Sequence, residues 1–137
     1  VRLGAGELVR FIEVQPIGLR TSQLRLRCVR CVDRARQIRI DGGEESTLQT
    51  IALCMANSRY FGGGMMIAPE AKLNDGMLDV INIGDLATLR VLSNVRSLYR
   101  GTHLDMKEVH SRRAKKVEIS AADASREIHL ETDGELP

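Results

Sequence analysis

Two carboxylates near the carboxyl end, Asp133 and Glu135, are the residues whose type and spacing best suit proton transfer. They flank Gly134 directly after an alternating pattern at residues 127–132, so a tight bend would leave both side chains near a surface. Either carboxylate could accept a proton from a hydroxyl group placed beside it. A plain turn explains the same residues, and the similar acidic turn at 41–44 shows how readily such a pattern arises.

A second candidate site is the oxygen-rich turn formed by Asn74, Asp75 and Gly76. Hard cations such as Mg²⁺ bind carboxylate and carbonyl oxygens, with water molecules completing the coordination shell. The turn holds only one acidic side chain, so composition alone favours an ordinary turn. A structural role and a metal-binding role both remain open for it.

Three consecutive glycines at 62–64 form the third candidate, because a glycine-rich loop can hold a phosphate group. The lysine and hydroxyl residue of a P-loop are missing, and Ile67-Ala68-Pro69 follows where a helix should begin. Since glycine is costly in chain entropy, the three residues indicate a sharp turn or a close approach to another segment.

Cysteine and histidine give weak signals. Cys28 and Cys31 have the spacing of half a zinc site, but no second pair of ligands lies at a fitting distance. The histidines, at positions 103, 110 and 129, are scattered, and His129 fits the surface of an alternating strand. Helical spacing explains the cysteine pair equally well.

The first half of the chain predicts one helix followed by strands. Apolar residues between Thr21 and residue 36 recur at helical spacing among arginines, which predicts a basic helix. Residues 37–40 alternate as a strand does, and Asp41-Gly42-Gly43 is a turn signal. Residues 48–56 (LQTIALCMA) predict one strand that is buried on both faces where the apolar run is continuous.

The second half predicts a strand at 77–83 and then a helix that Asp85 would cap. One face of this helix would carry five apolar residues, and Gly101 stands at the C-cap position; the five are Leu86, Leu89, Leu92, Val95 and Tyr99. After a polar loop, strands at 114–120 and 127–132 would pair antiparallel. Strands and helices do not alternate regularly, so the prediction is a mainly β fold with helical insertions, an antiparallel β-sandwich.

Composition narrows the class of protein. The chain has 137 residues, a net charge of +2 and a high charged fraction, as a single soluble globular domain has. No apolar run reaches the length of a membrane span. The first forty residues are rich in arginine, but they lack the interleaved aromatic side chains that stack on bases, so nucleic acid is not an expected partner.

Several motifs taken together resemble a known family. They are NSRYFGGGM at 57–65, IAPEAKLNDGMLD at 67–79, LYRGTH at 98–103 and DGE at 133–135. In this order they resemble the carboxy-terminal part of the bacterial diacylglycerol-kinase-like lipid kinases, the family that includes DgkB and YegS. The likeness covers about 38–136, and residues 1–36 match less well.

The resemblance implies a two-domain enzyme that transfers phosphate from ATP to diacylglycerol or a similar lipid alcohol. It implies that Glu135 is the proton acceptor, that Asp133 helps to position the reacting groups, and that Mg²⁺ binds the Asp75 carboxylate and the carbonyl oxygens of Lys72 and Met77. Asn74 stands where the family often has a second aspartate.

The nucleotide-binding motif of the family, Gly-Gly-Asp-Gly-Thr, does not occur in the sequence. The expectation is therefore a lead-in at 1–36 that contains the basic helix, and a carboxy-terminal β-sandwich domain at 37–137, truncated at its end. Such a chain would lack the amino-terminal nucleotide-binding domain that is its partner in the intact enzyme, and would be inactive by itself.

Further partners and alternatives follow from the same resemblance. The enzyme would be cytoplasmic, would associate peripherally with a membrane and would bind its lipid substrate at the membrane surface. The resemblance also allows a homodimer. A sphingoid base or phosphatidylglycerol could replace diacylglycerol as the acceptor. A different class of protein, a non-catalytic β-sandwich module that binds lipid or another protein, is the alternative.

Overall fold

A computed structural model describes the backbone at residues 2–3, 9–13, 27–30, 35–84, 88–121 and 128–132, and the side chains at 37–84 and 93–120. The described elements are β1 (Arg2–Leu3), β2 (Val9–Glu13), β3 (Arg27–Arg30), β4 (Ala35–Ile40), β5 (Ser46–Gln49), β6 (Ala52–Ala56), β7 (Leu78–Ile83), α1 (Thr88–Arg100), the 3-10 helix η2 (Thr102–Asp105), β8 (Val109–Ala114), β9 (Lys116–Ala121) and β10 (Ile128–Thr132).

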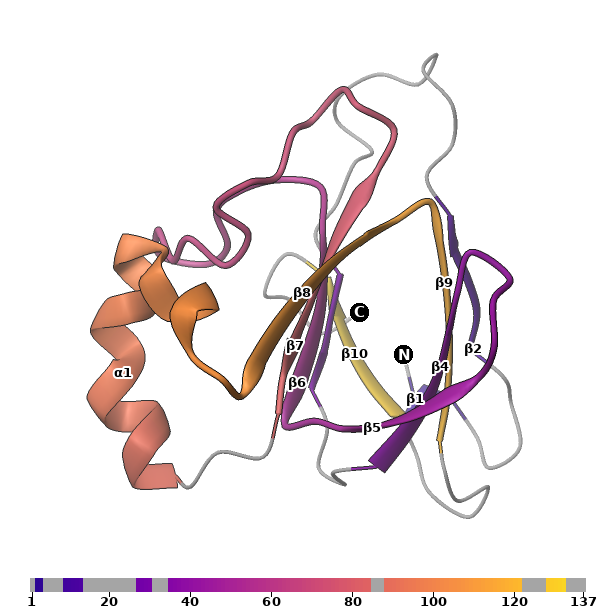
Figure 1. Ribbon diagram of the computed structural model, residues 1–137, viewed down its shortest axis with the longest axis horizontal. Helices are drawn as coiled ribbons and strands as arrows, with labels where there is room; N and C mark the ends of the chain where they lie inside the picture. Colours follow the sequence, from indigo (N-terminus) through magenta and orange to yellow (C-terminus); the bar gives the residue numbers. More distant parts are fainter. Residues whose placement is uncertain are drawn as a thin grey trace.

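The strands form two antiparallel sheets, which confirms the predicted fold class. In the described part of the chain, the larger sheet has the order β1-β10-β3-β6-β7-β8 and the smaller has the order β2-β9-β4-β5. The smaller sheet lies on one side of the larger sheet, and α1 with η2 lies on the other (Figure 1).

Each side of the larger sheet has its own apolar core. Between the sheets, side chains of β6 and β7 pack against β4 and β9, and this core contains Ile38, Leu53, Met55, Leu78, Val80, Ala114, Val117 and Ile119. Because side chains alternate along a strand, the other residues of β6 and β7 face the side of the sheet on which α1 lies. There Cys54 and Ile81 pack with Ile67, Ala68 and Leu98.

Strand structure is confirmed at 48–49 and at 52–56, where β6 is buried, but the prediction of one continuous strand is wrong, because the chain changes sheets at residues 50–51. β5 pairs with β4 in the smaller sheet, and β6 pairs with β3 and β7 in the larger sheet. At the corner, the buried Thr50 places Oγ1 2.8 Å from the carbonyl oxygen of Ala52 and 3.1 Å from that of Ile83. The hydroxyl thus adds a hydrogen bond at a corner where the backbone N–H of Ile51 also donates to the carbonyl oxygen of Ile83, at 2.9 Å.

The basic helix predicted from Thr21 to residue 36 is wrong wherever the structure describes that stretch. Residues 27–30 form β3, which pairs with β10 on one side and β6 on the other. Apolar residues three and four apart fit a helix face in isolation, but a strand at this place gains backbone pairing along both edges. Residues 21–26 and 31–34 lie outside the described residues.

The predicted pairing of the two last strands is also wrong. β9 pairs with β2 and β4, whereas β10 pairs with β1 and β3 in the other sheet. The predicted polar loop before β9 is instead largely strand β8, whose central residues are exposed. β8 has a partner on one side only among the described strands, and its exposed face needs no apolar alternation.

Helix α1 and its glycine terminator are confirmed, but its predicted apolar face is wrong at Val95 and Tyr99, and the side chains of Leu89 and Leu92 are not among those described. Val95 is 37% exposed and Tyr99 49%, whereas Leu98 packs on the core. The helix therefore buries a face rotated from the one that Val95 and Tyr99 share. Leu86, like the capping residue Asp85, lies outside the described residues. Among the described helices, none has the length and hydropathy that crossing a membrane requires.

Candidate functional site

The link between β6 and β7, residues 57–77, begins with a glycine hairpin. Phe61 and Met65 exchange backbone hydrogen bonds of 2.8 and 3.0 Å, and the three glycines between them have φ values of 28°, 46° and 90°. Such left-handed conformations favour glycine. The glycines are exposed, and no atom lies unusually close to them. They serve a sharp turn, as predicted, and not a close approach.

The segment from α1 to η2 braces this link. The backbone N–H of Met66 donates to the carbonyl oxygen of Leu98 at 2.9 Å. His103 is buried, and its Nε2 lies 2.9 Å from the carbonyl oxygen of Ile67. Gly101, with φ of 72°, stands so close to Pro69 that a Cβ there would lie 2.9 Å from the ring carbon Cγ. Two sequence motifs that are far apart along the chain therefore form one unit.

The turn at residues 72–77 is organised by Asp75 and Gly76. Asp75 Oδ1 accepts the backbone N–H of Met77 at 3.0 Å, and Gly76 supplies a left-handed residue with φ of 69°. Asp75 Oδ2 accepts a hydrogen bond from Arg113 on β8, with which it also forms an ion pair. The ion pair ties the turn to the edge of the larger sheet.

A second carboxylate, Asp79, lies next to this ion pair. Asp79 stands directly opposite Arg113 across the pairing of β7 and β8. It is 2% exposed, and its Oδ2 has no hydrogen-bond partner among the described atoms. Burial raises the pKa of the Asp79 carboxyl, Arg113 opposes that rise, and the charges of Asp75 and Glu70 add to it. Arg113 is thus ion-paired with Asp75 and stands across from the buried Asp79.

Asn57 approaches the same turn from the end of β6. Its Nδ2 donates to the carbonyl oxygen of Leu73 at 3.5 Å, while its Oδ1 is buried and has no partner among the described atoms. Buried polar atoms usually have a partner in a folded protein. Asn57 Oδ1 and Asp79 Oδ2 are therefore two oxygen atoms that a bound water or ion could satisfy.

The predicted cation site has suitable donors. The Asp75 carboxylate and the carbonyl oxygens of Lys72 and Met77 are hard oxygen ligands, as Mg²⁺ prefers. A carboxylate oxygen has more than one lone pair, so Oδ1 can retain the Met77 amide while it binds a cation. Arg113 is the competing group at Oδ2. Among the described residues, no three acidic, histidine or cysteine side chains converge on a metal position. Backbone carbonyls would therefore be essential.

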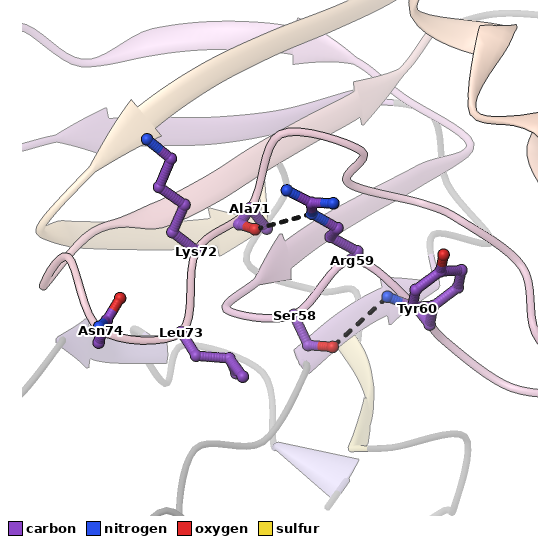
Figure 2. Close-up of a pocket in the computed structure, with 7 residues that line it drawn as sticks. All are labelled: Ser58, Arg59, Tyr60, Ala71, Lys72, Leu73 and Asn74. Carbon is purple, nitrogen blue, oxygen red and sulfur yellow. Dashed lines mark hydrogen bonds between the residues drawn. The ribbon is translucent and has the colours of Figure 1, made fainter.

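A shallow groove of about 530 Å³ opens beside this turn. Two short segments line it, residues 58–60 and residues 71–74. In the view of Figure 2, the amino group of Lys72 and the guanidinium of Arg59 lie in the upper part and Leu73 lies below them. Arg59 Nε donates to the carbonyl oxygen of Ala71 at 3.4 Å, which holds the two segments together.

The structure describes only some of the predicted site residues. Lys72, Asp75 and Met77 lie together in the turn described above. Asp133 and Glu135 lie outside the described residues, as does Cys31. Cys28 and His129 lie on strands β3 and β10, and their side chains are also outside the described part.

Sequence reasoning missed Asp79 and Arg113. An aspartate inside the mainly apolar stretch MLDVINI was an available signal for the first of them, because a charged residue is rarely buried without a reason. Nothing in the sequence around Arg113 indicates its partner, which lies 38 residues away along the chain.

This architecture, an antiparallel β-sandwich with a braced glycine-rich link on its outer face, defines a domain class. Residues 13–137 match the family described as the YegS C-terminal NAD kinase beta sandwich-like domain, and the chain belongs to that family. It is similar to a diacylglycerol kinase of Mycobacterium tuberculosis strain H37Rv, with 29% identity over 97 residues. That match covers 71% of this chain and 30% of the relative.

Solved structures of relatives show the same fold. A putative diacylglycerol kinase from Bacillus anthracis has a TM-score of 0.60 at 17% identity, over 82% of this chain and 46% of its own. A second diacylglycerol kinase structure from that organism gives 0.58 at 16% identity, over 80% and 42%. The chain therefore spans less than half the length of each of these relatives.

Proposed function

We propose that this chain is the carboxy-terminal domain of a lipid kinase that transfers the γ-phosphoryl group of ATP to diacylglycerol or a similar lipid alcohol. The observation that carries the proposal is membership of the YegS carboxy-terminal family together with relatives named diacylglycerol kinase. The chain spans about 30% of the length of the curated relatives. In this proposal, as the family resemblance implies, most of the ATP site belongs to an amino-terminal domain outside this sequence.

In this proposal Glu135 is the general base. Its carboxylate takes the proton from the lipid hydroxyl as that oxygen attacks the γ-phosphorus, and the bond from the γ-phosphorus to the bridging oxygen of ADP breaks. Asp133, two positions earlier in the sequence, helps to orient the reacting groups. Phosphoryl transfer depends mainly on alignment and on neutralisation of charge, so one well-placed carboxylate is a sufficient base.

The turn at residues 72–77 would hold Mg²⁺ through Asp75 and the carbonyl oxygens of Lys72 and Met77. A cation there supplies positive charge that stabilises the turn beside the sheet. Two buried oxygens without partners among the described atoms, Asn57 Oδ1 and Asp79 Oδ2, support this role because both belong to residues next to the turn or its ion pair. A third such oxygen, Asn82 Oδ1, lies further along β7.

The test is lipid phosphorylation by the complete protein that contains this chain, with diacylglycerol in mixed micelles and radiolabelled ATP. Glu135→Gln keeps the shape of the side chain and removes the base, so we expect a loss of about 10²–10⁴-fold in kcat. Glu44→Gln, in the exposed acidic turn after β4, is the matched control and should keep full activity. Unchanged activity in folded Glu135→Gln would exclude Glu135 as the base.

The 137-residue chain by itself is expected to be inactive, because it lacks the Gly-Gly-Asp-Gly-Thr motif. The same assay with the purified chain checks this expectation. ATP-dependent phosphorylation by the chain would contradict it, whereas a complete protein without lipid kinase activity would favour a non-catalytic module.

A further inference from the structure

The groove between residues 58–60 and 71–74 is lined by two cationic side chains that form no ion pair within the described residues. The Nη atoms of Arg59 and the Nζ of Lys72 make no hydrogen bond or ion pair within the described residues, although Arg59 Nε donates to the carbonyl oxygen of Ala71. No acidic side chain lines the groove. Glu70, two residues before Lys72, is exposed but does not line the groove, and Asp75, three residues after it, is paired with Arg113. The lining itself therefore carries two positive charges and no negative one.

Two large apolar side chains stand in the same groove and face solvent. Tyr60 is 54% exposed and Leu73 is 53% exposed. These two contribute an aromatic ring with a polar end and a branched aliphatic chain. Tyrosine is favoured where a membrane meets water, and leucine partitions into the acyl region.

The groove is held in shape before any ligand binds. Three hydrogen bonds join its two walls or their immediate neighbours. Arg59 Nε donates to Ala71, the N–H of Ala68 donates to the carbonyl oxygen of Arg59 at 3.3 Å, and Asn57 Nδ2 donates to the carbonyl oxygen of Leu73. A preformed surface loses little conformational entropy on binding.

We propose that this groove docks on an anionic phospholipid surface. Arg59 and Lys72 would meet the phosphate groups, while Tyr60 and Leu73 would enter the interface beside them (Figure 2). The inference deepens the proposed function and rests on it for its biological purpose, since a lipid kinase must reach a substrate held in a bilayer. A shallow open groove suits contact with a membrane surface better than it suits a small molecule, which usually binds in an enclosed cavity.

The test is co-sedimentation of the 137-residue chain with vesicles, measured without ATP. Vesicles of phosphatidylcholine alone are compared with vesicles containing 30% phosphatidylglycerol, which is on the order of the anionic content that basic segments recognise. We expect binding to the anionic vesicles only, weakened as salt is raised because screening shortens the reach of surface charges. Inorganic phosphate at the same phosphate concentration should not compete, because the bilayer supplies the apolar part of the contact.

Two pairs of variants separate charge from apolar contact. Arg59→Gln with Lys72→Gln should lower the partition coefficient roughly 30-fold, since each basic residue near an anionic surface is worth about fivefold. Lys107→Gln with Lys115→Gln removes the same charge from exposed positions outside the groove and should change binding much less. Leu73→Ser should lower binding about tenfold. Val95→Ser, an exposed apolar position on α1, is its control.

The outcomes distinguish this surface from its alternatives. Equal binding to neutral vesicles, or equal losses in the control variants, would overturn the proposal. Competition by inorganic phosphate would assign the groove to a free phosphate compound instead. Vesicle binding by a protein without lipid kinase activity would keep the docking surface and remove the proposed function. Kinase activity of the complete protein on a short-chain soluble acceptor, without vesicle binding, would keep the proposed function and remove the docking surface.

Discussion

Gly101 links the end of α1 to the glycine-rich link, and its replacement by alanine should cost more than a glycine turn normally does. Its φ of 72° is a left-handed conformation, which costs a residue with a Cβ about 1–2 kcal/mol. The new Cβ would also lie 2.7 Å from Met66 Sδ and 2.9 Å from Pro69 Cγ. The methionine can move, but the proline ring is fixed to its own backbone.

The crowding adds a second cost to Gly101→Ala. Overpacking typically costs about 1–3 kcal/mol, so the expected total is about 2–5 kcal/mol of the free energy of unfolding. Gly42→Ala is the matched control, because Gly42 has a φ of 73° but no atom within 4 Å of an added Cβ. It should lose only the conformational part, about 1–2 kcal/mol.

Urea denaturation followed by circular dichroism measures both variants. A double variant, Gly101→Ala with Pro69→Ala, tests the mechanism directly, because removing the ring should restore part of the loss. We expect its destabilisation to be smaller than the sum of the two single effects by about 1–2 kcal/mol, a coupling normal for residues in contact. Equal losses in Gly42→Ala and Gly101→Ala, or strict additivity in the double variant, would refute the reasoning.

Two further predictions concern the acidic turn and its neighbour. Asp79→Asn removes a buried charge. Because the folded protein binds a proton at Asp79 more readily than the unfolded chain does, the wild type gains stability as pH falls toward the ordinary value of 3.8. The free energy of unfolding of Asp79→Asn, relative to that of the wild type, should therefore be highest at neutral pH and fall as the pH is lowered. Urea denaturation of both proteins from pH 7 to 4 measures this difference. A difference that is constant with pH would contradict it. Mg²⁺ at one hundred times its Kd should stabilise the wild type by about 2.7 kcal/mol. Calorimetric unfolding should show no such gain in Asp75→Asn, while the exposed Asp105→Asn should behave as the wild type. An equal gain in Asp75→Asn would place the ion elsewhere.

Local patterns predicted the strands whose side chains alternate between core and solvent. Val117 and Ile119, at alternate positions of the strand predicted at 114–120, are buried in β9. The turn at Asp41 has the positive φ values of 50° and 73° that its Asp-Gly sequence favours. Gly101 ends α1 as predicted. In each case the signal lies within a few residues of the feature.

The features that local patterns did not predict depend on contacts between residues that are far apart in the sequence. The apolar run at 48–56 contains no local sign that Thr50 marks a change of sheet, because its hydroxyl partners include the carbonyl oxygen of Ile83. β8 reads as a polar loop because an exposed edge strand needs no apolar alternation. At the candidate site, Asp75 was found from its turn sequence, but Arg113 reaches it only because β7 and β8 pair in this register.

The brace between α1 and the glycine-rich link has a consequence for how the length of the chain can vary. From Met66 to Ala71 the link is held by Leu98, by His103 and by the walls of the groove, so an added residue would break several contacts together. At the exposed glycine hairpin, only the exchange between Phe61 and Met65 must be kept. Insertions among relatives, or engineered tags, are therefore best accommodated between these two residues.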